Sequence, residues 1–352
     1  MPNITSLRFF LAILVVIYHI PQFCLNRGFP YFDDLAVFQR GPEAVCVFFA
    51  LSGFLIIRLL YIEKEKTNTI SLKLFYQRRI LRIFPLYYAV LIFGLFYYYF
   101  LLEKLGFEYE SGCDLKTSIL LGGTFFANVL ITKNPGGIIE ILWSIGIEEQ
   151  FYIFIAPLLL LIPKPKITVF LLLFSGIYFA AYNFLKDLPL SKYHMMYFYF
   201  SAGGFFSILS YQGKLKMPNI LSILIIVTFV LYFVTPLADF INSVAVSHLF
   251  KMLLFSLILC ALVQKPYPIM ENRVFKYLGE ISYGIYALHP IVIQLVGFVF
   301  LKFIVQMNLN PVCFIIAFNM AVVLLTILAA HISYKYFERY FLKMKKRSFS
   351  IG

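Results

Sequence analysis

The chain has 352 residues, of which 61% are hydrophobic, 19% aromatic and 13% charged, and its mean hydropathy is +0.86. Soluble domains carry roughly 25% charged residues, so this composition excludes a soluble protein and indicates an integral membrane protein. The formal net charge of +13 does not indicate nucleic acid as a partner. The Lys and Arg residues lie in short loops and near the C-terminus, which is the pattern that orients membrane proteins.

The apolar stretches predict an all-α fold, a polytopic transmembrane helical bundle. A single domain over residues 1–340 would be followed by a basic cytoplasmic tail at 341–352. The first stretch lacks a cleavage site and is interpreted as a retained span. Eleven candidate spans follow from hydropathy, at residues 5–24, 43–61, 79–102, 117–132, 143–162, 166–184, 192–210, 218–235, 246–264, 281–302 and 311–333.

Eleven crossings conflict with the charge pattern of the loops. The basic loop 63–82 and the basic C-terminal tail both predict a cytoplasmic location, which requires an even number of crossings. The weakest candidate is 117–132, which is short and contains Gly122, Gly123 and Asn128. We therefore predict about ten crossings, both termini in the cytoplasm, and a re-entrant or non-crossing segment at 117–132 that forms a cavity wall.

The five cysteines show no metal-like spacing. Cys24 and Cys113 both fall near predicted outer loops, so a disulfide between them is one interpretation.

The first span carries Arg8 near its start and His19 eleven residues later. Eleven residues make about three helical turns, so both side chains point the same way, about 16 Å apart along the axis. Ionisable groups are expensive in lipid, and this pair is predicted to face a protein interior or a wet cavity. A neutral imidazole there can act as a general base. The alternative is a snorkelling Arg8 and a His19 that only bonds a neighbouring helix.

Two further stretches precede the middle of the chain. In FFALSGFLI, the small residues Ser52 and Gly53 indicate close helix packing and no chemistry. In QRRILRIFP, Arg79 and Arg82 share a helix face at the predicted cytoplasmic surface. Two guanidinium groups suit a phosphate-bearing ligand, although a topological anchor or a contact with anionic lipids fits equally well.

The stretch WSIGIEEQFY holds the single tryptophan, Trp143, followed by Ser144, Glu148 and Glu149. The topology predicts that it begins at the outer surface. Adjacent helical residues point about 100° apart, so one glutamate is expected to face the cavity and the other the outer interface. The glutamate in the cavity would pair with an arginine or orient His19.

The stretch YLGEISYGIYALHP places Ser282, Tyr286 and His289 at i, i+4 and i+7, as one polar stripe on an apolar helix. His289 is expected at a depth close to that of His19. A histidine satisfied within the core and a catalytic histidine are both consistent with this pattern.

These five motifs, in this order and over residues 5–335, resemble the membrane acyltransferase-3 family of integral-membrane O-acyltransferases that modify bacterial surface glycans. The resemblance implies transfer of an acyl group, usually acetyl from cytoplasmic acetyl-CoA, to a sugar hydroxyl of a surface polysaccharide such as lipopolysaccharide or of a lipid-linked glycan. It implies a multi-pass protein of the bacterial cytoplasmic (inner) membrane, with no metal ion.

In the family, the residues that correspond to Arg8, His19, Arg79 and Arg82 are the functional ones. The resemblance therefore implies coenzyme A binding by Arg79, Arg82 and Arg8, and catalysis at His19 by general-base attack or through an acyl-histidine. Glu148 or Glu149 would orient a histidine or the sugar, with Trp143, Ser144, Ser282, Tyr286 and His289 near the substrate. Some members carry an extracytoplasmic esterase-like domain. Without one in this sequence, we expect transfer to finish in the membrane or to need a separate extracytoplasmic protein.

Two other classes use similar polar stripes. A transporter of glycans or lipid-linked sugars would line its path with them, and so would a polymerase or glycosyltransferase acting on polyprenyl-linked sugars. Binding of acetyl-CoA separates these classes, because neither alternative needs it.

Overall fold

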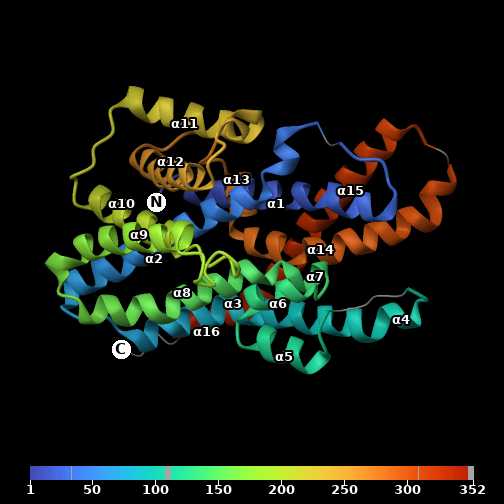
Figure 1. Cartoon of the computed structure of the whole chain (residues 1–352), viewed down its shortest axis with the longest axis horizontal. Coiled ribbons are helices and arrows are strands. Elements are labelled where there is room, and N and C mark those ends of the chain that lie inside the picture. Colours follow the sequence, from blue (N-terminus) through green and yellow to red (C-terminus); the bar gives the residue numbers. More distant parts are fainter. Residues whose placement is uncertain (33, 108–111, 308, 348–352) are drawn as a thin grey trace.

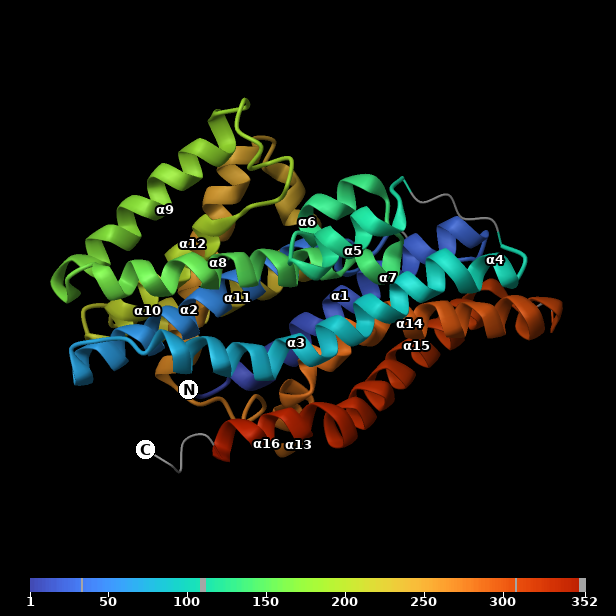
Figure 2. The ribbon, with the colours of Figure 1, turned by 90° about the horizontal axis from the view of Figure 1, so that it is seen from below.

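A computed structural model describes residues 1–32, 34–107, 112–307 and 309–347, and all regular structure in these ranges is helical. Most of the long helices run along the long axis of the molecule (Figures 1 and 2). The α-helices are α1 (Ile4–Arg27), α2 (Gly41–Thr67), α3 (Leu72–Phe96), α4 (Leu102–Lys104), α5 (Leu115–Gly123), α6 (Ala127–Leu130), α7 (Gly137–Glu140), α8 (Leu142–Leu161), α9 (Ile167–Phe184), α10 (Tyr197–Tyr211), α11 (Asn219–Val234), α12 (Val244–Gln264), α13 (Arg273–Glu280), α14 (Ser282–Val299), α15 (Pro311–Ser333) and α16 (Arg339–Arg347).

Eight helical stretches of the described chain are long and apolar enough to cross a membrane, which confirms the all-α transmembrane bundle. They contain α1, α2, α3, α8, α9, α12, α14 and α15. The helices α10 and α11 have 15 and 16 residues and are shorter than the roughly 20 residues of an ordinary crossing. These ten helices equal the expected number of crossings, but the number and the orientation remain predictions.

The segment expected at 117–132 is not a continuous helix. It is divided between α5, α6 and a short 3₁₀ turn, and it packs on α3 and α8. The carbonyl groups at the end of α5 accept hydrogen bonds from Tyr87 and Tyr88 of α3, at 2.7 and 2.9 Å. The Gln150 amide donates to the carbonyl oxygen of Phe125 at 2.8 Å. Side chains thus satisfy irregular backbone, as membrane depth requires, and the re-entrant path remains a prediction.

The centre of the bundle is the contact between α2 and α10. A Cβ added at Gly53 would lie 1.8 Å from the carbonyl oxygen of Phe200, and one added at Gly203 would lie 2.1 Å from that of Ala50. Small residues allow two helix backbones to approach this closely. Gly53 therefore has the packing role that the sequence predicted.

The start of α1 is fixed by polar contacts with the segment between α12 and α13. The Asn3 side-chain amide donates to the carbonyl oxygens of Leu262 and Lys265, and the Asn3 backbone N–H donates to Glu271. A hydrogen bond from Lys276, followed by the one from Asn3, lowers the pKa of the Glu271 carboxyl. These contacts set the position of the helix that carries Arg8 and His19.

The structure corrects the expectation about the cysteines and adds detail to the one about the basic tail. All five cysteines are thiols, and Cys24 is buried within α1, so the interpretation of a Cys24–Cys113 disulfide is wrong. The predicted basic tail begins inside α16, which packs on α3 and extends to Arg347. Residues 348–352 lie outside the described residues.

Candidate active site

Arg8 and His19 point into two different cavities on the same side of α1. Arg8 lines what we call the arginine cavity, whose other lining residues include Ser52, Arg79, Arg82, Ser144, Glu148, Tyr152, Ser282 and Tyr286. His19 lines the histidine cavity, together with Gln22, Asn26, Arg27, Asn134, Glu140 and Gln294. The two residues thus share a helix stripe, as predicted, and the stripe joins two compartments.

The arginine cavity collects three guanidinium groups from two helices. Arg8 comes from α1, while Arg79 and Arg82 lie one turn apart on α3. None of the three forms a salt bridge within the described chain. The guanidinium carbon of Arg79 stacks over the ring of Tyr152 at 5.7 Å, and its buried Nε has no acceptor. Such an excess of positive charge with unfilled donors suits an anionic ligand.

Glu148 is the carboxylate of this cavity. Its Oε1 accepts a hydrogen bond of 2.5 Å from the Ser52 hydroxyl and another from Tyr152. Arg79 and Glu148 line the same space because α3 and α8 pack together with Glu148 about two turns into α8. Glu148 is thus the glutamate that faces a cavity containing arginines, as one of the two was expected to do, whereas its expected position at the outer surface remains a prediction.

Glu149 lines neither cavity. Its side chain is buried and its Oε1 has no hydrogen-bond partner. Exactly one of the two glutamates faces the cavity, as predicted, but the other lies in the protein interior and not at the outer interface. Neither glutamate has a hydrogen bond to a histidine among the described residues.

The histidine cavity has a volume of about 510 Å³ and a mixed lining, in which Gln22, Asn26, Asn134 and Glu140 are polar. His19 Nδ1 lies 3.1 Å from Oε1 of Gln22, one turn further along α1. An Nδ1–H that donates to this oxygen leaves the lone pair of Nε2 available, which is the state that a general base needs. Sequence reasoning missed Gln22, although its i+3 position relative to His19 is a usable signal.

A thin polar wall separates the two cavities. The Tyr286 hydroxyl lies 2.6 Å from the Ser144 hydroxyl and donates to the carbonyl oxygen of Ile141 at 3.0 Å. One turn along α14, the ring of His289 stacks on His19 with centroids 5.1 Å apart. His289 Nδ1 donates to the Tyr286 carbonyl oxygen at 2.6 Å, and its buried Nε2 has no partner. Ser282 and Tyr286 both line the arginine cavity, and the ring contact places His289 beside His19, while the depth of the two histidines in the membrane remains a prediction.

One predicted site residue, Trp143, lies outside the two cavities, and two residues of the arginine cavity were not predicted. Trp143 lines neither cavity. Its indole packs edge-on against Phe49, with ring centroids 5.9 Å apart, and lies 5.3 Å from the ring of His194. Ser52 was assigned to packing alone, yet its hydroxyl binds Glu148 in the arginine cavity. Tyr152 was also missed, although it follows Glu148 at i+4, where helix side chains meet.

The known proteins described next, which are similar to this chain, are all named acetyltransferases. The chain is 28% identical to a provisionally named acetyltransferase, ORF330, of the Acidianus two-tailed virus, over 85% of each chain. It is 25% identical to the peptidoglycan O-acetyltransferase OatA of Listeria monocytogenes, over 84% of this chain and 49% of OatA. It is 26% identical to a provisionally named O-acetyltransferase of Staphylococcus aureus strain MSSA476, over 97% of this chain and 57% of the relative.

The chain thus spans about half of the length of OatA. No solved structure matches the chain. The profile of the acyltransferase-3 family, described as an acyltransferase domain, matches residues 1–331 and so covers nearly the whole chain, including both cavities. The protein therefore belongs to the acyltransferase-3 family and is a membrane-embedded acyltransferase.

Proposed function

We propose that the protein transfers an acetyl group from acetyl-CoA to a hydroxyl group of a sugar, on a surface polysaccharide or a lipid-linked glycan. The observation that carries this proposal is the pair of cavities that meet at one wall. One contains three guanidinium groups that form no salt bridge within the described chain, and the other contains His19, whose Nδ1 lies 3.1 Å from Oε1 of Gln22. A donor with phosphate groups and an acceptor with hydroxyl groups are the ligands that these two linings suit.

The phosphate groups of coenzyme A bind at Arg8, Arg79 and Arg82 in this proposal. The arginine cavity has a volume of about 110 Å³, whereas whole ligand sites measure about 300–1,000 Å³. It therefore takes the narrow pantetheine arm and a phosphate, while the nucleotide lies outside it toward the N-terminal end of α3. We assign this end to the cytoplasm, which agrees with the basic residues around it.

The transfer takes place where the wall separates the cavities. The Nε2 of His19 takes the proton of the acceptor hydroxyl, whose oxygen attacks the thioester carbonyl carbon. The carbon–sulfur bond breaks, and the coenzyme A thiolate receives a proton, so the products are an acetyl ester and free coenzyme A. An acyl-histidine intermediate at His19 is the other route. In either route, the Tyr286 side chain must move so that the thioester reaches His19, because Tyr286 and Ser144 close the arginine cavity on that side.

The test is to supply radiolabelled acetyl-CoA and candidate glycans to the purified full chain in nanodiscs, and to detect the acetylated glycan by mass spectrometry. We expect transfer by the wild type and no detectable transfer by His19→Ala, with an unchanged melting temperature. The matched control is His331→Ala, because His331 bonds to Tyr277 and lines neither cavity. Normal transfer by His19→Ala would overturn the proposed role of this histidine.

A further inference from the structure

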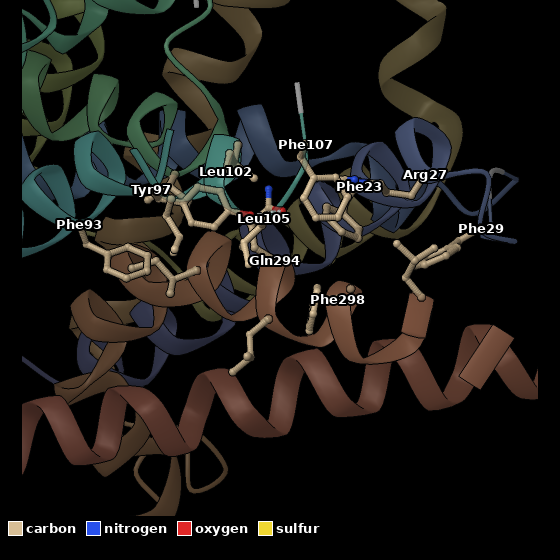
Figure 3. A pocket seen from close by; sticks show the side chains of 16 residues that line it. Phe23, Arg27, Phe29, Phe93, Tyr97, Leu102, Leu105, Phe107, Gln294 and Phe298 are labelled. Atoms are coloured by element: carbon tan, nitrogen blue, oxygen red, sulfur yellow. Dashed lines mark hydrogen bonds between the residues drawn. The ribbon is translucent and has the colours of Figure 1, made fainter. Parts of the chain in front are cut away.

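A third cavity lies beside the histidine cavity, between the end of α1, the end of α3 with α4, and α14 (Figure 3). Its volume is about 380 Å³, and we call it the apolar cavity. Its lining is almost entirely hydrocarbon, with Phe23, Phe93, Leu105 and Phe298 around its sides, and the polar side chains are Arg27, Tyr97 and Gln294. A cavity with this lining suits an aliphatic chain and not a sugar.

The apolar cavity reaches the side of the bundle that faces lipid. Leu295, Phe298 and Leu301 line it and are 60%, 42% and 40% exposed. All three belong to the apolar stretch Ser282–Met307, which is long enough to cross a membrane. Exposed leucine and phenylalanine on such a stretch face the hydrocarbon of the bilayer. A chain can therefore enter this cavity sideways from the membrane.

The apolar cavity adjoins the histidine cavity. Six residues line both of them: Phe23, Arg27, Tyr97, Leu102, Phe107 and Gln294. On the far side of this boundary the lining becomes polar, with Gln22, Asn26 and Glu140 near His19. A single ligand that spans both spaces must be apolar at one end and rich in hydrogen-bonding groups at the other.

Arg27 lies at the junction of the two spaces (Figure 3). It is the last residue of α1, eight residues after His19, which is about 12 Å along the helix. Its guanidinium carbon lies 5.7 Å from the ring centroid of Phe23 and 5.6 Å from that of Phe107. It forms no salt bridge within the described chain. A guanidinium held by two aromatic rings between an apolar and a polar space suits a phosphate group.

We propose that the apolar cavity binds the aliphatic chain of a lipid-linked sugar acceptor, whose phosphate binds Arg27 and whose sugar occupies the histidine cavity. This inference rests on the proposed acetyl transfer and selects the membrane-anchored acceptor over a free or fully assembled polysaccharide. Bulk phospholipid offers the same chain and phosphate, but only the lipid-linked sugar also fills the polar space next to His19. About 12 Å of helix between Arg27 and His19 leaves room for sugar between the phosphate and the modified hydroxyl.

The binding test uses polyprenyl diphosphate as the probe and the full chain in nanodiscs, with bound lipid detected by native mass spectrometry. Leu295→Trp narrows the cavity, and Arg27→Gln removes the cation. We expect each to raise the dissociation constant of the probe about tenfold. For Leu295→Trp the cause is the lost burial of about two CH₂ groups of the chain, and for Arg27→Gln it is the lost charged hydrogen bond to the phosphate. The matched controls are Leu324→Trp, at a lipid-facing leucine of α15 that is 56% exposed, and Lys192→Gln, at an exposed cation beside Tyr193. Both should bind the probe as the wild type does.

The activity test compares a polyprenyl-diphosphate-linked oligosaccharide with the same oligosaccharide released from its lipid. For the wild type we expect a lower KM with the linked form than with the released form. Leu295→Trp should raise the KM for the linked form to about that of the released form. Equal KM values for both forms, or a wild-type cavity that retains bulk phospholipid and not the probe, would overturn this inference and leave the proposed function intact. Absence of acetyl transfer to either form, with normal probe binding, would count against the proposed function instead.

Discussion

At the scale of residues, the arrangement of charge is the most informative feature. A buried or half-buried guanidinium without a partner is costly, and three of them around one small space repel each other. Glu148 is the carboxylate that lines this space, and it is already engaged by Ser52 and Tyr152. A structural network would pair the arginines with more carboxylates. This unpaired arrangement is the reason for proposing that an anion from outside the chain completes the site.

The first prediction concerns this anion. Arg82→Gln should raise the dissociation constant of coenzyme A about tenfold to a hundredfold, because a hydrogen bond to a charged group contributes about 1.5–3 kcal/mol. Isothermal titration of the nanodisc-embedded protein measures this constant. Arg78→Gln is the matched control, because Arg78 pairs with Glu63 at 3.5 Å and does not line the cavity. An unchanged constant for Arg82→Gln, or an equal rise for both variants, would reassign these arginines to topology or to lipid contact.

At the scale of elements, the close contact of α2 with α10 holds the site together. Ser52, which binds Glu148, is next to Gly53, whose Cα faces the Phe200 backbone. The helix cannot shift at Gly53 without moving Ser52 in the arginine cavity. Glu148 belongs to α8, and the C-terminal end of this helix is held by Lys64 of α2. This ammonium donates to the carbonyl oxygens of Leu159, Leu160 and Ile162 at 2.8, 2.8 and 2.6 Å. Three carbonyl groups at the C-terminal end of the helix, which have no partner within the helix, thus accept hydrogen bonds from one buried ammonium.

The second prediction concerns Gly53. Gly53→Ala should lower the melting temperature markedly, because overpacking against side chains already costs about 1–3 kcal/mol and here the obstacle is backbone. Gly176→Ala in α9 is the control, since nothing lies within 4 Å of its added Cβ. That variant should be neutral or slightly stabilising, as alanine is the better helix former. Thermal unfolding of the detergent-purified protein compares the two, and equal melting temperatures would mean that α2 and α10 are not in close contact.

The third prediction concerns Lys64. Lys64→Met should destabilise the protein, because hydrogen bonds from a charged donor contribute about 1.5–3 kcal/mol and the three carbonyl groups would lose their donor. Lys66→Met, two residues further along α2, changes an exposed lysine and should have little effect. The same thermal unfolding assay applies. If both variants melt at the wild-type temperature, water replaces the ammonium at this helix end.

At the scale of the whole molecule, hydropathy predicted the class of fold and the positions of most helices. The predicted spans 246–264 and 311–333 correspond closely to α12 and α15. Other helices extend beyond the predicted spans because they continue past their apolar residues. α2 runs on to Thr67 through Glu63–Lys66, which favour helix but lower the hydropathy. Spacing predicted that Arg79 and Arg82 share a face. It could not predict which helices meet, so it missed the Ser52–Glu148 bond and the arrangement of three neighbouring cavities.

The last prediction concerns the path of the chain through the membrane. We place single cysteines at Lys116 and Lys133 in a cysteine-free background. These two positions lie on either side of the segment 117–132, which the charge pattern predicts not to cross the membrane. Both lysines are exposed, so a maleimide reagent reaches either position if it can reach that side of the membrane. In oriented vesicles, a membrane-impermeant maleimide should label both from the outside and Asn68→Cys, between α2 and α3, only from the inside. The physical reason is that the C-terminal half of α3 and the start of α7 pack together, with Gly94 against Ile139, so the segment leaves and returns at the same end of the bundle. Labelling of Lys116→Cys and Lys133→Cys from opposite sides would make 117–132 a true crossing. The termini would then lie on opposite sides of the membrane, and the expectation of two cytoplasmic termini would be wrong.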